Sequence, residues 1–113
     1  MTPIKSNAPV ALFVYNRLDT VKKTIAHLQR NELAEDTELF IFSDGGKDKK
    51  SWKQVERLRE EMRRTTGFKQ VTLIERPVNI YLERNILEGI AYLFERYDRL
   101  IVLEDDICTS PYF

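Results

Sequence analysis

The chain has 113 residues, of which 42% are hydrophobic, and this is enough for the core of one domain. Its 18 basic and 18 acidic side chains cancel, so no overall charge favours nucleic acid or an acidic membrane surface. The single cysteine, Cys108, excludes a disulfide within the chain, and no apolar run is long enough to cross a bilayer. We therefore predict one cytoplasmic domain over residues 1–113, without a transmembrane segment or a nucleic-acid partner.

Four apolar runs predict strands. They are rich in Val, Ile, Leu and Phe, do not alternate with polar residues, and occupy residues 9–15, 38–43, 70–75 and 99–104. Such runs are typical of strands that are covered on both faces of a parallel sheet. Their starts lie about thirty residues apart, which is the length of a strand plus a crossover helix.

The segments between these runs have helical periodicity. The apolar stripes are Leu18, Val21, Ile25 and Leu28; Trp52, Val55, Leu58 and Met62; and Leu82, Ile86, Ile90 and Leu93. Asp19 is the expected N-cap of the first helix, and Gly67 is the expected stop of the second. The sum is a βαβαβαβ order, which predicts an α/β layer fold with a mainly parallel sheet of about four strands and right-handed crossovers. The order of the strands in the sheet does not follow from this pattern.

Polar residues follow each predicted strand at the edge where ligands bind in open α/β sheets. These strand ends are residues 15–17, 43–46, 75–79 and 104–106. Asp44 can accept a hydrogen bond from a base or a sugar, or it can form an ordinary Asx turn that leads into the second helix. The acids from Glu104 to Asp106 offer the oxygen ligands that suit Mg²⁺ or Mn²⁺, or they form an acidic turn in solvent.

The segments APVALFVYNRLDTVKKTI, FIFSDGGKD, NIYLERNILEGI and RLIVLEDDICTSPYF follow one another in this order. Together they resemble the donor-binding half of a GT-A glycosyltransferase, akin to bacterial proteins of family 2 and to N-acetylglucosaminyltransferase I. The resemblance covers roughly residues 8–113, and its strongest motif, VLEDDI followed by SPYF, is a variant of the DxD metal signature. It implies a three-layer, Rossmann-like nucleotide-diphospho-sugar transferase fold. It also implies a glycosyltransferase that uses a nucleotide-sugar, expected to be a UDP-sugar, and Mn²⁺ or Mg²⁺ to glycosylate a saccharide acceptor.

The resemblance implies roles for seven residues. Arg17 would contact the nucleotide, Asp44 would accept a hydrogen bond from the base, and Asn79 and Arg84 would border the donor pocket. At the acidic strand end, Glu104 and Asp105 would contact the ribose and the donor sugar, and Asp106 would bind the metal ion directly. The metal ion would bridge the diphosphate and stabilise it as the leaving group.

Two features depart from the family pattern. The glycine that the family has two residues after the loop asparagine is replaced here by Tyr81, which could narrow the pocket or change the path of the loop. The acceptor-binding half, with the catalytic base, is expected beyond Phe113, so no catalytic residue is expected within the chain. We therefore expect an N-terminal fragment that is inactive alone and whose uncovered apolar surface permits self-association.

Two other functions are compatible with an α/β fold. A receiver-like signalling domain also clusters acids around Mg²⁺, but its paired acids follow the first strand, whereas here they follow the fourth. A fragment that folds without binding a nucleotide is the other alternative. His27 and Cys108 are expected to be structural, and the KDKK run at residues 47–50 is expected to be a solvated loop that could reach a phosphate.

Overall fold

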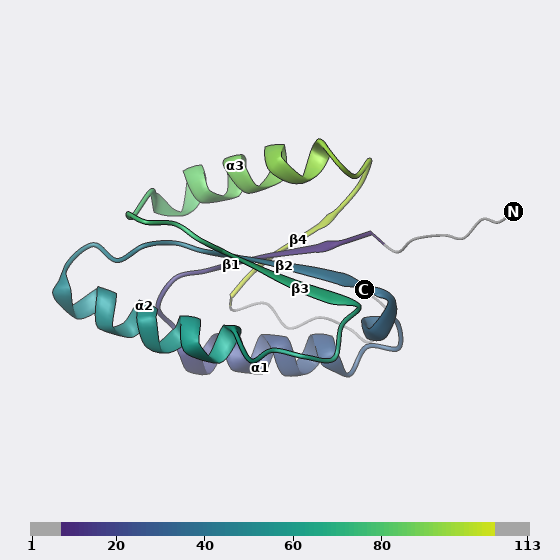
Figure 1. Cartoon of the computed structure of the whole chain (residues 1–113), viewed down its shortest axis with the longest axis horizontal. Coiled ribbons are helices and arrows are strands. Elements are labelled where there is room, and N and C mark those ends of the chain that lie inside the picture. The colour runs from purple at the N-terminus through teal and green to yellow at the C-terminus, as the bar shows by residue number, and fades with distance from the viewer. Residues whose placement is uncertain (1–7, 106–113) are drawn as a thin grey trace, which may run out of the picture.

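The computed structural model describes residues 8–105, and the elements alternate along them as the sequence predicts (Figure 1). Their order is β1 (Val10–Val14), α1 (Leu18–Gln29), a short 3-10 helix η1 (Ala34–Asp36), β2 (Glu38–Ser43), α2 (Lys49–Met62), β3 (Gln70–Glu75), α3 (Tyr81–Phe94) and β4 (Ile101–Glu104). Every predicted strand and helix is found, although β4 begins two residues later than predicted.

All strand pairs of the described sheet are parallel, and the order is β3-β2-β1-β4. The first strand of the chain is therefore central: Val10 pairs with Leu39 of β2 on one side and with Ile101 of β4 on the other. The predicted α/β fold with a mainly parallel sheet is confirmed, and the structure adds the strand order that the sequence left open.

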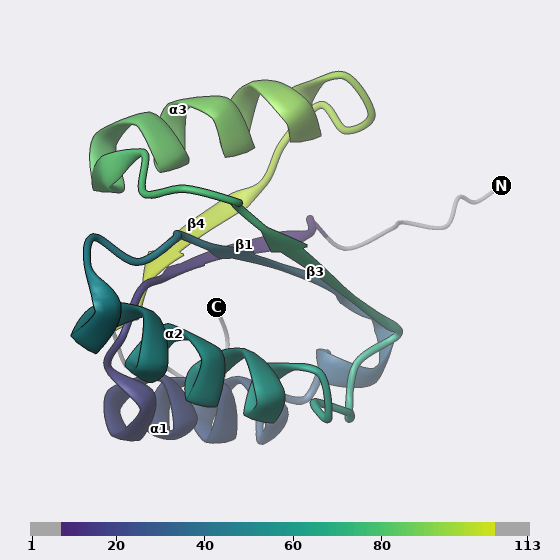
Figure 2. The same ribbon diagram turned by 60° about the vertical axis from the view of Figure 1, so that its left-hand side comes forward.

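The helices cover both faces of the sheet, with α1 and α2 on one face and α3 on the other (Figure 2). Side chains alternate along a strand, so β1 contributes to two cores. Val10, Leu12 and Val14 pack with the apolar residues of α1 and α2, whereas Ala11 and Phe13 pack in the cluster that contains Leu93 of α3. The result is the three-layer arrangement expected from the sequence.

Two details of the helices differ from the sequence predictions. Helix α1 begins at Leu18 after Arg17, so Asp19 lies in the first helical turn and is not the N-cap. An acid in the first turn still complements the helix dipole. Trp52 was expected in the core but is only half-buried, at the edge of the stripe that α2 buries with Val55 and Met62.

The buried stripe of α3 is shifted from the one predicted. Leu82 is 50% exposed, and the buried residues are Asn85, Gly89 and Leu93. A Cβ atom on Gly89 would lie 2.7 Å from Cε1 of Phe13, so the glycine allows the helix to lie directly on the sheet. Asn85 and Gly89 therefore face inward together with Leu93, whereas Leu82 of the predicted stripe lies on the outer side. None of the helices within residues 8–105 has the length and apolar character needed to span a bilayer.

Candidate functional site

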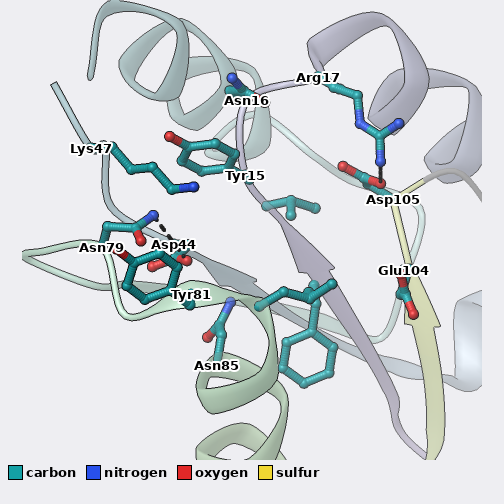
Figure 3. A pocket seen from close by; sticks show the side chains of 13 residues that line it. Tyr15, Asn16, Arg17, Asp44, Lys47, Asn79, Tyr81, Asn85, Glu104 and Asp105 are labelled. Carbon is teal, nitrogen blue, oxygen red and sulfur yellow. Dashed lines mark hydrogen bonds and ion pairs between the residues drawn. The ribbon is translucent and has the colours of Figure 1, made fainter. Parts of the chain in front are cut away.

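The strands end at one edge of the sheet, and a pocket opens among the residues that follow them (Figure 3). Val14 is in register with Ser43, and Ser43 with Glu75, while β4 ends at Glu104 beside Phe13. The pocket volume is about 200 Å³. Closed sites for drug-sized ligands measure roughly 300–1,000 Å³, so this pocket can enclose only part of such a ligand. Its polar lining consists of Tyr15, Asn16, Arg17, Asp44, Lys47, Asn79, Tyr81, Asn85, Glu104 and Asp105.

The Asp44 carboxylate lies at the centre of the hydrogen bonding in the pocket and is only 4% exposed. Its Oδ1 accepts from the backbone N–H groups of Gly45 and Ile80, each at 2.8 Å. Its Oδ2 accepts from Asn79 Nδ2 at 3.2 Å. Asp44 therefore fixes the loop after β3 to the end of β2. Since a carboxylate oxygen can accept two hydrogen bonds, Oδ2 retains one further position for a donor.

Asn79 is oriented by two acceptors. Its Nδ2 donates to Asp44 Oδ2 and to the Gly45 carbonyl oxygen at 2.8 Å, which uses both amide hydrogens. Its Oδ1 is buried and has no hydrogen-bond partner among the described residues. A buried acceptor without a donor costs free energy, so the two hydrogen bonds of the Nδ2 group hold the side chain in place at that cost. The structure thus brings Asp44 and Asn79 together, as the sequence predicted for two strand ends.

Gly45 makes this arrangement possible. A Cβ atom at this position would lie 2.5 Å from the carbonyl carbon of Val78 and 2.9 Å from the backbone nitrogen of Asn79. Both neighbours are backbone atoms of the loop after β3, which cannot yield without moving Asn79. The glycine is therefore required because the two loops pack backbone against backbone.

Arg59 of α2 holds the ends of β2 and β3 from the other side and is only 6% exposed. Its Nε donates to Ser43 Oγ at 2.8 Å, and its Nη2 donates to the Ser43 carbonyl oxygen at 3.1 Å. Nη2 also donates to the carbonyl oxygens of Asp44 at 3.2 Å and Arg76 at 2.9 Å. Burial lowers the pKa of Arg59, an effect that nearby Glu75 opposes, but a guanidinium remains protonated in proteins. The buried cation therefore fixes the backbone that carries the pocket.

Arg17 and Asp105, both expected to contact the donor, form an ion pair with each other. Arg17 Nη2 lies 2.9 Å from Asp105 Oδ1, and the arginine side chain is exposed whereas the aspartate is buried. The backbone oxygen of Asp105 accepts a hydrogen bond from Thr24 Oγ1 at 2.8 Å. Both residues line the pocket together with the exposed Glu104. Their contacts with a donor remain predictions.

The expected metal ligand, Asp106, lies outside the described residues, and so does Cys108. Within residues 8–105, no group of three or more His, Cys, Asp or Glu side chains is placed to hold a metal ion. The Mn²⁺ or Mg²⁺ site therefore stays a prediction.

Arg84 does not line the pocket. Its Nε donates to Glu88 Oε2 at 2.7 Å on the exposed face of α3, and this hydrogen bond lowers the pKa of Glu88. The next residue, Asn85, lines the pocket instead and was not among the expected site residues. Asn85 Nδ2 donates to the Phe42 carbonyl oxygen at 3.3 Å, and Asn85 Oδ1 accepts from Arg76 Nε at 3.0 Å. A role of Arg84 in donor binding remains a prediction.

Three further residues of the pocket were not predicted as site residues: Tyr15, Lys47 and Tyr81. Figure 3 shows their side chains gathered with Asp44 and Asn79 at one end of the pocket. The Nζ atom of Lys47 lies 5.0 Å from the centre of the Tyr81 ring, which is the geometry of a cation–π contact. Tyr15 lies in the strand end of residues 15–17, Lys47 begins the KDKK run, and Tyr81 stands where glycine was expected, so all three had a signal in the sequence.

Comparison with known proteins gives one finding. No curated protein matches the chain. The family model described as glycosyl transferase family 2 matches residues 10–113, a span that includes all described strands and helices. This match favours a transferase over the receiver-like alternative, and it agrees with the parallel sheet and with the pocket at its carboxyl edge. A closer likeness to N-acetylglucosaminyltransferase I remains a prediction. The chain belongs to glycosyl transferase family 2 and has the fold of the donor-binding half of a GT-A glycosyltransferase.

Proposed function

We propose that this chain binds the nucleotide-sugar donor of a glycosyltransferase, that the donor is a UDP-sugar, and that the sugar is transferred to a saccharide acceptor. The observation that carries the proposal is the Asp44 carboxylate, buried at the pocket and left with one accepting position on Oδ2. Around it the pocket offers aromatic rings and amide groups, which suit a flat heterocycle with hydrogen-bonding edges.

Uracil fits the free position on Asp44 better than cytosine does. The N3–H group of uracil is a donor, and a carboxylate oxygen accepts from it. The N3 atom of cytosine is an acceptor, which would place two acceptors against each other at a buried site. Such a mismatch leaves both groups unpaired and is strongly disfavoured. Asp44 therefore supports UDP over CDP.

The residues after β4 fit a divalent ion that is shared with phosphate groups. Mg²⁺ is commonly held by one or two carboxylates, with substrate phosphates and water as its other ligands. Glu104 is an exposed carboxylate at the pocket, and Asp106 follows two residues later in the sequence. When bound, Mn²⁺ or Mg²⁺ would act as a Lewis acid that stabilises the diphosphate leaving group.

The chain's own residues would bind and orient the donor. Asp44 and Asn79 would hold the base, and the Arg17 side chain, exposed at the rim, would contact the nucleotide while its pairing with Asp105 keeps it in place. No residue of the chain is proposed as the catalytic base.

Isothermal calorimetry tests this function by measuring the affinity for UDP in the presence and absence of MnCl₂. CDP, ADP and GDP, which carry other bases, are measured for comparison. We expect UDP to bind in the presence of Mn²⁺, to bind more weakly without it, and to bind more tightly than CDP. The Asp44→Asn variant, which exchanges one acceptor oxygen for an amide donor, should lose the preference for UDP over CDP. Absence of binding by every nucleotide, with or without metal, would refute the proposal.

A further inference from the structure

Tyr81 is held in a backbone conformation that tyrosine normally avoids. Its φ angle is +70°, and it is the only non-glycine residue of the described chain with a positive φ. The left-handed region is open to glycine but crowds the Cβ atom of every other residue. Such strain persists where the surrounding structure imposes it, and it concentrates at functional sites.

The loop before Tyr81 imposes this conformation. Ile80 is buried, and its backbone N–H donates to Asp44 Oδ1 at 2.8 Å. Asn79 is tied to Gly45 by its amide, and Val78 packs backbone to backbone against Gly45. The chain must therefore turn within one residue to enter α3, and that residue is Tyr81.

Core packing does not explain why a tyrosine occupies this position. The residue is 64% exposed, and its phenol group makes no hydrogen bond with the other described residues. The contact of its ring is with the ammonium of Lys47 at 5.0 Å. A glycine here would relieve the strain without leaving a cavity in the core. The packing of the folded chain therefore gives no reason for an aromatic ring at this position.

The position of the ring suggests what it contacts. Tyr81 lines the same pocket as Tyr15 and Asp44, and Figure 3 shows the side chains of all three at the same end of it. Lys47, whose ammonium meets the face of the Tyr81 ring, lines the same pocket. Stacking on a base is worth more than a cation–π contact at an exposed site, so a planar ligand can displace the ammonium.

We propose that Tyr81 is a specificity-determining residue whose ring forms an aromatic wall for the nucleobase of the donor. This inference rests on the proposed function, because it requires that the pocket bind a nucleotide. The strained backbone places the ring at the pocket, and the nucleobase stacks on it while its polar edge meets Asp44. The position thus contributes base stacking, which a glycine could not supply.

Three substitutions at Tyr81 separate the ring from the backbone, with UDP and MnCl₂ as ligand in calorimetry. Tyr81→Phe keeps the ring and should bind UDP within about twofold of the parent. Tyr81→Ala removes the ring and keeps a Cβ atom, whereas Tyr81→Gly removes both. Both should weaken UDP binding by roughly 5- to 100-fold, which is the range for loss of one stacked base. The melting temperature of Tyr81→Gly should equal or exceed that of Tyr81→Ala, because glycine relieves the strain.

Two controls make the result specific. Leu87→Ala changes a residue on the same helix that is 63% exposed and does not line the pocket, and it should leave UDP binding unchanged. Pyrophosphate with MnCl₂ carries no base, so its affinity should be the same for the parent and for Tyr81→Ala.

Each other outcome overturns the inference. A stacking role is refuted if Tyr81→Ala binds UDP as tightly as the parent protein does. It is also refuted if only Tyr81→Gly binds UDP more weakly, because that loss would reflect only the greater freedom of the glycine backbone. Equal loss of pyrophosphate and UDP binding would indicate a general disturbance of the pocket. If the parent protein binds UDP and the variants behave in one of these ways, the proposed function stands without this inference. If the parent binds no nucleotide, both fail.

Discussion

Replacement of Arg59 by methionine should destabilise the fold strongly, because it removes a buried cation that serves several backbone groups. The substitution keeps a long, unbranched side chain, so little packing volume is lost. The buried carbonyl oxygen of Asp44 and the half-buried one of Arg76 lose the donor that Nη2 supplies, and Ser43 loses donors to its hydroxyl and carbonyl oxygens. The carbonyl oxygen of Ser43 keeps the backbone N–H of Arg76 at 2.9 Å.

An unpaired buried acceptor costs about 1–3 kcal/mol and a half-buried one less, so we expect a loss of about 3 kcal/mol in the free energy of unfolding once the lost Ser43 hydrogen bonds are included. For a domain of this size that corresponds to a fall of roughly 12 °C in melting temperature. Urea unfolding, followed by circular dichroism, measures the free energy directly. Arg57→Met is the matched control, since Arg57 is an exposed arginine two residues earlier on the same helix. The reasoning is refuted if the two variants lose the same stability, or if Arg59→Met loses less than about 1 kcal/mol.

Three further predictions concern the pocket, a helix end and the core. Asp44→Ala should lower the free energy of unfolding by about 2–4 kcal/mol in urea, because three hydrogen bonds of a buried carboxylate are lost and Asn79 keeps only its bond to the Gly45 carbonyl oxygen. Asp48 caps α2, and its hydrogen bonds lower the pKa of its carboxyl group. The stabilisation by the Asp48 cap is therefore complete at neutral pH and is lost as the pH falls through the ordinary aspartate pKa towards the lower folded pKa. Between about pH 7 and pH 3, the melting temperature of Asp48→Ala should therefore vary less than that of the parent protein. Gly89→Ala should cost about 1–3 kcal/mol in the same urea assay, because the new methyl group would lie 2.7 Å from Phe13.

Each of these predictions has an outcome that contradicts it. A fully stable Asp44→Ala protein would mean that the loop after β3 is held by its other contacts. Parallel acid profiles for the parent and Asp48→Ala would show that the cap does not titrate as described. A stability gain in Gly89→Ala would mean that helix propensity outweighs the contact with Phe13.

The layers of the fold could be predicted because apolar runs and helical stripes recur with a regular spacing. The order of the strands could not, because a crossover helix can place the next strand on either side of its neighbour. The sequence from Val10 to Glu104 contains no local signal that β4 returns to the free side of β1. That choice depends on which sheet faces remain uncovered after α1 and α2 have packed on one of them.

The convergence of Asp44 and Asn79 could be predicted because parallel strands end at one edge of the sheet. The inward position of Asn85 was not predicted, because its neighbour Arg84 carries the charge by which donor-binding residues are usually recognised. The spacing of four residues between Asn85, Gly89 and Leu93 was available as a signal, but it lacks the large apolar side chains by which buried helix faces are recognised.

Arg59 was missed for a related reason. It lies four residues after Val55 and three before Met62, so helical periodicity places it on the buried side of α2. An arginine is normally assigned to solvent unless a partner is known. Its partners are backbone carbonyl oxygens of strand ends, and a sequence does not reveal which carbonyl groups lack a donor.

The central place of β1 has a consequence for the time course of folding. Among the described strands β1 comes earliest in the chain, and it gains its second neighbour only when Ile101 meets Val10 from nearly the opposite end of the described residues. Closing so long a loop is entropically costly, and contacts between distant residues slow folding. Of the strands in residues 8–105, β4 therefore joins the sheet last. Until residues up to Glu104 have left the ribosome, the β1 edge of the nascent chain lacks its β4 partner and is open to pairing with other chains.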